Sequence, residues 1–179
     1  MREMAVRIRF QSPCLGNCKE ITADRRTTGR MVLPRNAAGD VIFMATWHLA
    51  NMRQAARLLN VHHDAVGAIT WDVIVDGQTP SGAERWYKRW YTGDNGRRRY
   101  VLHECFPAGW EIGLNCAVPT TITDDDLWRL MQAAGRYWGL SPWRPGTFGR
   151  YDVVGYRQRR LLVPETPADL SQPAAIEKA

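Results

Sequence analysis

The chain has 179 residues, is 45% hydrophobic and 10% aromatic, and carries a net charge of +6. This apolar content excludes a chain that is disordered throughout, and the length suffices to bury a core. No apolar run approaches the roughly 20 residues that cross a bilayer, and residues 1–6 lack the apolar core of a signal peptide. We therefore expect a cytoplasmic protein with no membrane partner.

The basic residues are almost all arginine, with 21 arginines against three lysines. The planar guanidinium group suits phosphate and stacks on bases, although a GC-rich genome would give the same bias without selection on chemistry. Residues 164–179 carry −2, which leaves +8 on residues 1–163. We expect a single basic domain over 1–163 that attracts polyanions, followed by a flexible acidic tail over 164–179.

Hydrophobic periodicity and turn residues predict strands and two helices. In chain order we expect a strand over 4–10, a loop over 11–29, a hairpin of 30–34 and 41–44 around a turn at 36–39, a helix over 46–60, a strand over 69–75, a hairpin of 85–91 and 97–105, a strand over 110–118, a helix over 123–138 and a closing strand over 151–154. Reduced to essentials, this is an α+β fold with a ferredoxin-like β-α-β-β-α-β core and inserted β-hairpins. Two helices on one face of the sheet leave the other face free for a ligand.

Both helices carry recognisable end and surface signals. The second begins with Thr123 as its cap and Asp124–Asp126 in its positively polarised first turn, and Gly139 ends it. On the first helix, Arg53 and Arg57 stand four residues apart, so they share a solvated face.

The loop over 139–150 is longer and richer in glycine than most helix–strand connections, which suggests function. Glycine adopts backbone angles that other residues avoid, so the loop could bring Arg144 and Arg150 close to a bulky anion. Trp143 could stack on a base while Arg144 holds a phosphate. In the alternative interpretation, Trp143 fills the gap between loop and helix, and Arg144 is merely solvated.

The segment over 85–91 interleaves charges with aromatic rings. As a strand it would place Arg85, Tyr87, Arg89 and Tyr91 on one face and Trp86, Lys88 and Trp90 on the other. The facing strand adds Arg97–Arg99, so either face could combine stacking with phosphate contacts. In the alternative interpretation, Trp86 and Trp90 pack on the core while the arginines are solvated.

These features together resemble a known family. A hairpin through Pro34 and 41–44 leads into the first helix, and the chain later runs from helix through glycine loop into Gly149-Arg-Tyr-Asp-Val153. Over residues 28–156 this pattern is similar to the RAMP superfamily, the ferredoxin-like RNA-binding subunits that form the backbone of CRISPR effector complexes. It is also similar to short uncharacterised phage proteins built on the same plan. The loop departs from the family by having two prolines in place of denser glycines.

The resemblance implies RNA binding, with phosphate contacts from the loop arginines Arg144 and Arg150 and from Arg53 or Arg57 on the first helix. Nothing in the sequence marks the nuclease subset of the superfamily. The compact length agrees with a phage or mobile-element protein.

Metal binding and catalysis have weaker signals. Cys14 and Cys18 have C-x3-C spacing, with His103 and Cys105 as further candidate ligands, but no second matched pair follows. Small buried cysteines are the alternative, and we expect no metal or other cofactor. An endoribonuclease needs a general base near the ribose hydroxyl, for which His103 or His48 could serve, although their spacing does not select them.

We therefore expect a non-enzymatic protein that binds single-stranded RNA or DNA, RNA favoured, with little base specificity. The predicted contact residues are Arg53, Arg57, Arg85, Tyr87, Arg89, Trp90, Arg97, Arg99, Trp143, Arg144 and Arg150. A host or phage nucleoprotein complex and a second copy of the chain are further candidate partners. The first alternative is a protein–protein module that inhibits a CRISPR-type effector complex or mimics one of its subunits, and the second is a metal-independent endoribonuclease.

Overall fold

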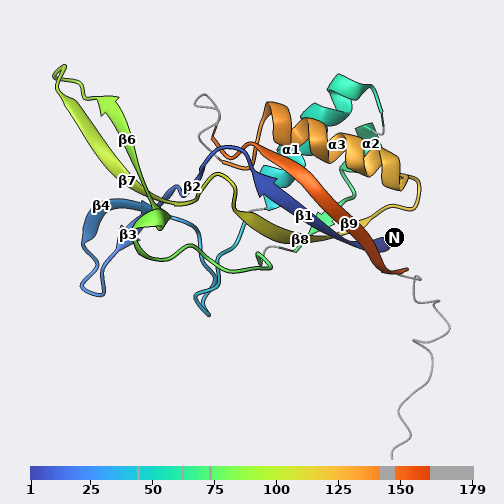
Figure 1. The fold of residues 1–179 in the computed structure, drawn as a ribbon, viewed down its shortest axis with the longest axis horizontal. Coiled ribbons are helices and arrows are strands. Elements are labelled where there is room, and N and C mark those ends of the chain that lie inside the picture. Colours follow the sequence, from blue (N-terminus) through green and yellow to red (C-terminus); the bar gives the residue numbers. More distant parts are fainter. Residues whose placement is uncertain (44, 62, 73, 142–147, 162–179) are drawn as a thin grey trace, which may run out of the picture.

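The computed structural model describes residues 1–161 apart from 44, 62, 73 and 142–147, and it has an α+β architecture (Figure 1). Its elements are β1 (Arg2–Phe10), β2 (Cys14–Leu15), β3 (Cys18–Ile21), β4 (Thr27–Val32), α1 (Ala45–Leu59), α2 (His63–Val66), β5 (Thr70–Trp71), a 3-10 turn η1 (Gly82–Arg85), β6 (Trp86–Thr92), β7 (Arg98–Phe106), β8 (Glu111–Val118), α3 (Asp124–Tyr137) and β9 (Tyr151–Leu161). No helix within the described residues is long and apolar enough to span a membrane.

The first sheet has the strand order β5-β8-β1-β9, and each neighbouring pair is antiparallel. Helix α1 precedes β5, and α3 joins β8 to β9. Both helices lie on one face of this sheet and pack against each other, as Figure 1 shows. The opposite face carries no helix in the described part of the chain, as expected for a sheet covered on one side.

The core lies between this sheet and its helices, because apolar residues alternate along the two central strands. The inward-facing residues are Met4, Val6, Ile8 and Phe10 on β1, Ile112, Leu114, Cys116 and Val118 on β8, and Leu127, Leu130 and Met131 on α3. The caps predicted for α3 are confirmed. The Asp126 N–H donates to Thr123 Oγ1 at 3.1 Å, and the Gly139 N–H donates to the Ala134 carbonyl at 2.9 Å.

The second sheet has five strands. Four follow the order β2-β7-β4-β3, and the fifth, β6, also pairs with β7. The β6–β7 hairpin continues past this sheet into solvent, at the upper left of Figure 1. We call residues 85–102 the arm. Its register runs from Trp86 opposite Glu104 to Thr92 opposite Arg98, so the predicted hairpin is confirmed with its turn near Gly96.

Three expectations from the sequence were wrong or incomplete. Residues 11–29 are not a loop, because β2, β3 and the start of β4 fall there. The residues of β3 alternate between half-buried and exposed but none is buried, so the sequence Cys-Lys-Glu-Ile has no apolar face that would mark a strand. The strands expected over 41–44 and 69–75 shrink to isolated bridges and the two residues of β5. Strand β9 runs to Leu161, beyond the expected end at 154, and pairs with the whole of β1.

Candidate nucleic-acid interface

One face of the arm carries rings and cations together. Because β6 is a strand, Trp86, Lys88 and Trp90 lie on the same face, and Trp90 is directly opposite Tyr100 on β7. Arg98 lies beside Trp90. We call these five residues, Trp86, Lys88, Trp90, Arg98 and Tyr100, the ring face.

The two outer rings of the ring face are open to solvent. The side chain of Trp90 is 47% exposed and that of Tyr100 is 50% exposed. Their ring centroids are 5.3 Å apart at an interplanar angle of 62°, an edge-to-face pair. The interpretation in which Trp90 packs on the core is therefore wrong. Large rings left in solvent on a projecting hairpin offer their flat faces to another molecule.

The cations of the ring face lie over these rings. Lys88 Nζ is 4.1 Å from the centroid of Tyr100 and 5.1 Å from that of Trp90, and the Arg98 guanidinium carbon is 4.7 Å from the Trp90 centroid. Among the described residues, neither cation takes part in an ion pair. Cation–π contact orients a charge without cancelling it, so both cations remain available to a phosphate.

The base of the arm repeats this arrangement with a residue from another strand. The guanidinium carbon of Arg85 is 4.7 Å from the Trp86 ring centroid, and that of Arg30 on β4 is 5.1 Å from it. Arg30 was not predicted as a contact, since only the pairing of β4 with β7 brings it to the arm. Lys88, Arg98 and Tyr100 were also missed, although their alternation in the two strands was visible in the sequence.

The arm's other face is more closely packed. The ring of Tyr87 meets the edge of Phe148 with centroids 5.4 Å apart, and Arg89 is half-buried. Arg97 and Arg99 are exposed, the first in the turn and the second opposite Tyr91. The structure thus brings six of the predicted contact residues onto the arm: Arg85, Tyr87, Arg89, Trp90, Arg97 and Arg99.

Three of the remaining predicted contacts lie away from the arm. Arg53 and Arg57 are exposed on α1, which packs on α3 at the first sheet. Arg150 is half-buried at the start of β9, and its N–H donates to Ser12 Oγ at 3.0 Å. Trp143 and Arg144 lie outside the described residues. A binding role for these five residues stays a prediction.

The glycines of the 139–150 loop have a structural explanation. Gly139 and Gly149 have φ angles of 68° and 71°, and a Cβ on Gly139 would stand 2.6 Å from the Gly149 carbonyl carbon. The two ends of the loop are held together because the Leu140 N–H donates to the Gly149 carbonyl at 2.9 Å. Gly139 and Gly149 therefore make room for the chain itself, and the expected approach of Arg144 to an anion lies outside the described residues.

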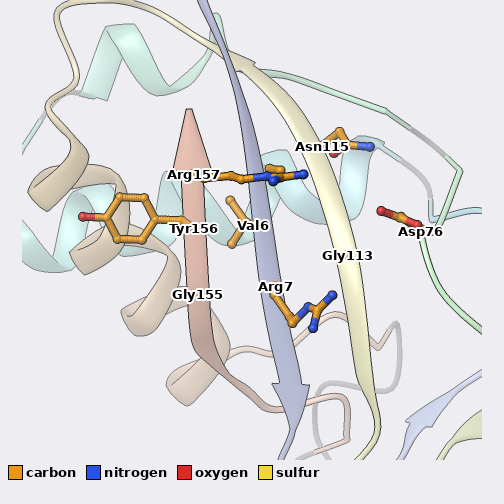
Figure 2. Close-up of a pocket in the computed structure, with 9 residues that line it drawn as sticks. Val6, Arg7, Asp76, Gly113, Asn115, Gly155, Tyr156 and Arg157 are labelled. Carbon is orange, nitrogen blue, oxygen red and sulfur yellow. The ribbon is translucent and has the colours of Figure 1, made fainter. Parts of the chain in front are cut away.

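The uncovered face of the first sheet is a second candidate site. A cavity of about 360 Å³ lies over β1, β8 and β9 there, and its lining includes Arg7, Arg157 and Asn115. Figure 2 shows these side chains over the strands. Gly113 and Gly155 also line the cavity, and they have no side chains to fill it. The cavity could admit a small anion between its two arginines.

Acidic partners weaken this second candidate. Arg9 donates to Glu111 Oε1 from Nε at 2.9 Å and from Nη2 at 2.5 Å, and Arg7 lies 4.0 Å from the same carboxylate. Asp76 is at the rim of the cavity. The one aromatic residue in the lining, Tyr156, points away from the arginines in Figure 2 and packs against Trp128 with centroids 5.6 Å apart. This face therefore offers paired charge and no ring for a base.

The candidate general bases are buried. His48 stacks on Trp71 with centroids 4.4 Å apart, and burial lowers its pKa to about 3. His103 Nδ1 lies 2.8 Å from the Gly16 carbonyl oxygen, and its pKa is lowered, chiefly by burial and also by the charge of Arg89. Neither histidine is open to solvent.

The cysteines also sit in apolar surroundings. Cys14 is fully buried, which raises the pKa of its thiol, and burial raises the pKa of Cys105 to about 11. Both thiols therefore stay protonated at neutral pH. Within the described part of the chain, no three histidine, cysteine or acidic side chains cluster to hold a metal ion.

Comparison with known proteins adds a likeness in fold. No protein-family profile and no curated protein matches the sequence. The fold is similar to that of a chain in the cryo-electron microscopy structure of the Type III-B Cmr-beta bound to cognate target RNA, with a TM-score of 0.53 and 8% identity. The match covers 89% of this chain and 61% of that chain. A chain of a Type IV-B CRISPR complex gives a TM-score of 0.49 and 10% identity, over 94% of this chain and 97% of that one.

Proposed function

We propose that the protein binds single-stranded nucleic acid, RNA favoured, on the ring face of the arm. The observation that carries this proposal is the half-exposed pair Trp90 and Tyr100 with Lys88 and Arg98 over the rings. Unpaired bases stack on exposed rings, and the neighbouring phosphates attract the cations. Every base has a flat face, so this surface would bind strands with little regard to sequence.

The fold supports RNA as the strand and a multi-subunit complex as its setting. The neighbour in fold is a chain of an assembly bound to target RNA. The strand order β5-β8-β1-β9, with two helices on one face, supports a ferredoxin-like core of the RAMP type. In such a core the arm is an insertion between β5 and β8, where it can project without disturbing the first sheet.

The test is a titration of labelled single-stranded RNA and DNA at several salt concentrations. Stacking is worth about 1–3 kcal/mol per base, so Trp90→Ala should weaken binding by about 5- to 150-fold. Tyr137→Ala is the matched control, because Tyr137 is 58% exposed on α3, a helix that packs on α1 and β9. Equal affinity for the two variants would remove the ring face as the site.

The salt dependence tests the phosphate contacts separately. The logarithm of the binding constant should fall with the logarithm of salt concentration by about 0.7 for each phosphate contact on a single strand. A slope near zero would exclude electrostatic binding of a strand. Because tryptophan, tyrosine and arginine also dominate protein interfaces, a flat slope together with capture of a protein partner through Trp90 would favour the protein–protein alternative.

A further inference from the structure

A second concavity lies beside the arm, on the face opposite the ring face. It measures about 370 Å³ and lies between β3–β4 and the arm, lined among others by Lys19, Arg30, Met31, Arg89, Tyr91 and Val101. Ligand pockets begin at about 300 Å³, so this space suits a small ligand of roughly nucleotide size.

The pocket exists because two hairpins diverge from a fixed joint. Strand β4 pairs with β7 at one position, Met31 with His103, while β6 and β7 continue outward together. Next to this joint, Glu104 accepts hydrogen bonds from Arg35 at 2.6 and 2.7 Å and from the Leu33 N–H at 3.0 Å. These bonds tie the end of β4 to β7, so the walls of the pocket are positioned before any ligand arrives.

The lining suits an anion joined to a flat apolar group. Met31 and Val101 supply apolar surface beside the partly exposed ring of Tyr91. Three cations, Lys19, Arg30 and Arg89, also line the pocket, and none of its described lining residues is acidic. The nearest recorded carboxylate, that of Glu20, lies 4.0 Å from Arg30 in an exposed pair, which cancels little of the charge.

We propose that this pocket binds one nucleotide of the strand, with its base unstacked against Tyr91, Met31 and Val101 and its phosphate held by Lys19 and Arg89. The inference rests on the proposed function and deepens it. Arg30 lines the pocket and also lies 5.1 Å from the centroid of Trp86, so it joins the pocket to the ring-bearing side of the arm. A pocketed base can be selected by shape, which gives the protein a preference at one position of an otherwise nonspecific site.

Methionine methyl groups report on the pocket directly. In protein labelled with ¹³C at the methionine methyls, nucleoside monophosphates should shift the Met31 signal by ring current, saturating on the order of 1 mM. Met4, Met52 and Met131 are buried in the core and should not move. Inorganic phosphate should give no comparable shift at Met31. A Met31 signal unmoved by all four monophosphates would overturn the proposal.

Two variants separate the pocket from the ring face. Val101→Trp fills the pocket, and Val154→Trp makes the same change at an exposed position on β9. The Met31 shift should vanish in the first and persist in the second. Lys19→Gln leaves the apolar walls of the pocket in place and should weaken monophosphate binding about tenfold or more, which provides a test if Val101→Trp does not fold.

The outcomes distinguish the two proposals. If Trp90→Ala abolishes oligonucleotide binding while Met31 never responds to monophosphates, the ring face stands and the pocket falls. If Met31 responds but oligonucleotide affinity is indifferent to Trp90, the pocket stands and the ring face falls. A Met31 shift that survives both Val101→Trp and Lys19→Gln would place the ligand elsewhere and overturn the pocket.

Discussion

The arm and the uncovered face of the first sheet are both rich in arginine, but their cations meet different neighbours. On the arm, Lys88 and Arg98 lie over aromatic rings. On the sheet, Arg9 donates two hydrogen bonds to the carboxylate of Glu111, and Arg7 lies 4.0 Å from it. A cation hydrogen-bonded to a carboxylate is already paired, whereas one over a ring keeps its full charge. The neighbours of an arginine therefore locate a nucleic-acid surface better than the number of arginines does.

The ion pair between Arg35 and Glu104 is more deeply buried than the pairs on the sheet surface. Glu104 is 2% exposed and Arg35, its partner, is 33% exposed. Burial alone raises the pKa of Glu104, but the hydrogen bonds from Arg35 and from the Leu33 N–H outweigh burial and hold that pKa below its ordinary value. This carboxylate fixes the joint from which the arm projects.

The largest predicted effect is on that joint. Glu104→Gln leaves the Arg35 charge without its counter-charge, so we expect unfolding free energy to fall by about 3 kcal/mol, the low end for a broken buried pair because Arg35 is partly solvated. The matched control is Glu111→Gln in the exposed pair with Arg9, which should lose less than about 1 kcal/mol. Urea denaturation measures both, and equal losses would remove the distinction between the two pairs.

The same pair predicts a direction with pH. The pKa of Glu104 is lower in the folded protein than in the unfolded chain, so its contribution is present above the unfolded pKa of about 4.3 and is lost as pH falls toward the folded pKa. The stability difference between the natural protein and Glu104→Gln should therefore shrink below about pH 4.3. A difference that grows with acid would contradict this assignment.

The second prediction is that mild acid lowers the stability of the fold without changing binding by the arm. The folded pKa of His48 is about 3, because burial disfavours its charged form. Unfolded histidine titrates near 6.5, so between pH 6.5 and 5 the unfolded chain gains a proton that the folded protein refuses, and stability should fall by about 2 kcal/mol. His48→Phe keeps a ring against Trp71 and should reduce this slope, leaving the part that comes from His103, whose pKa is also lowered by burial. Thermal melts across the range test it, and an unchanged slope in the variant would exclude His48 as its source.

The arm should not respond over the same range. Residues 85–102 contain no histidine or cysteine, and histidine is the side chain that ordinarily changes charge in this range, so oligonucleotide affinity per folded molecule should stay constant while stability falls. Anisotropy titrations at both pH values, made at a temperature where the protein remains folded, measure this. A large change in affinity would show that a titrating group belongs to the binding surface.

Local patterns in the sequence were sufficient to predict the helices and the arm. Thr123 and Gly139 mark the ends of α3 within a few residues of the bonds that they make. The alternation of rings and charges in residues 85–91 predicted both faces of β6. Each of these signals depends on residues that are close together in the sequence, so tertiary contacts do not alter the element that it predicts.

Features that depend on distant contacts could not be predicted. Arg30 reaches Trp86 across 56 positions, and only the pairing of β4 with β7 brings the two together. The glycines of the 139–150 loop signalled close approach correctly, but sequence could not say that the approaching partner is the chain itself. In the same way, topology alone separates Arg53 on α1 from the arm.

The third prediction compares single charges in the two regions. Lys88→Gln and Arg98→Gln should each weaken oligonucleotide binding by up to about 1 kcal/mol, or about fivefold. Each should also reduce the salt slope by about 0.7. Arg9→Gln removes the same charge from the sheet and should change affinity less than about twofold, because Glu111 already accepts two hydrogen bonds from Arg9. Equal effects in the two regions would mean that the strand crosses the sheet as well.

The smallest predicted effect concerns the cavity on the uncovered face of the first sheet and involves no change of charge. A Cβ on Gly155 would meet no atom within 4 Å, whereas a Cβ on Gly113 would meet Asp76 at 3.1 Å. Glycine in a strand is less stable than alanine by roughly 0.5–1 kcal/mol, so Gly155→Ala should stabilise the protein by about that amount and Gly113→Ala should not. Urea denaturation measures the stability of both variants.

Neither variant should alter oligonucleotide affinity, because the arm lies elsewhere. A loss of affinity in Gly155→Ala as large as in Lys88→Gln would mean that a strand needs the clearance over β1, β8 and β9, and the sheet would then replace the arm as the binding surface.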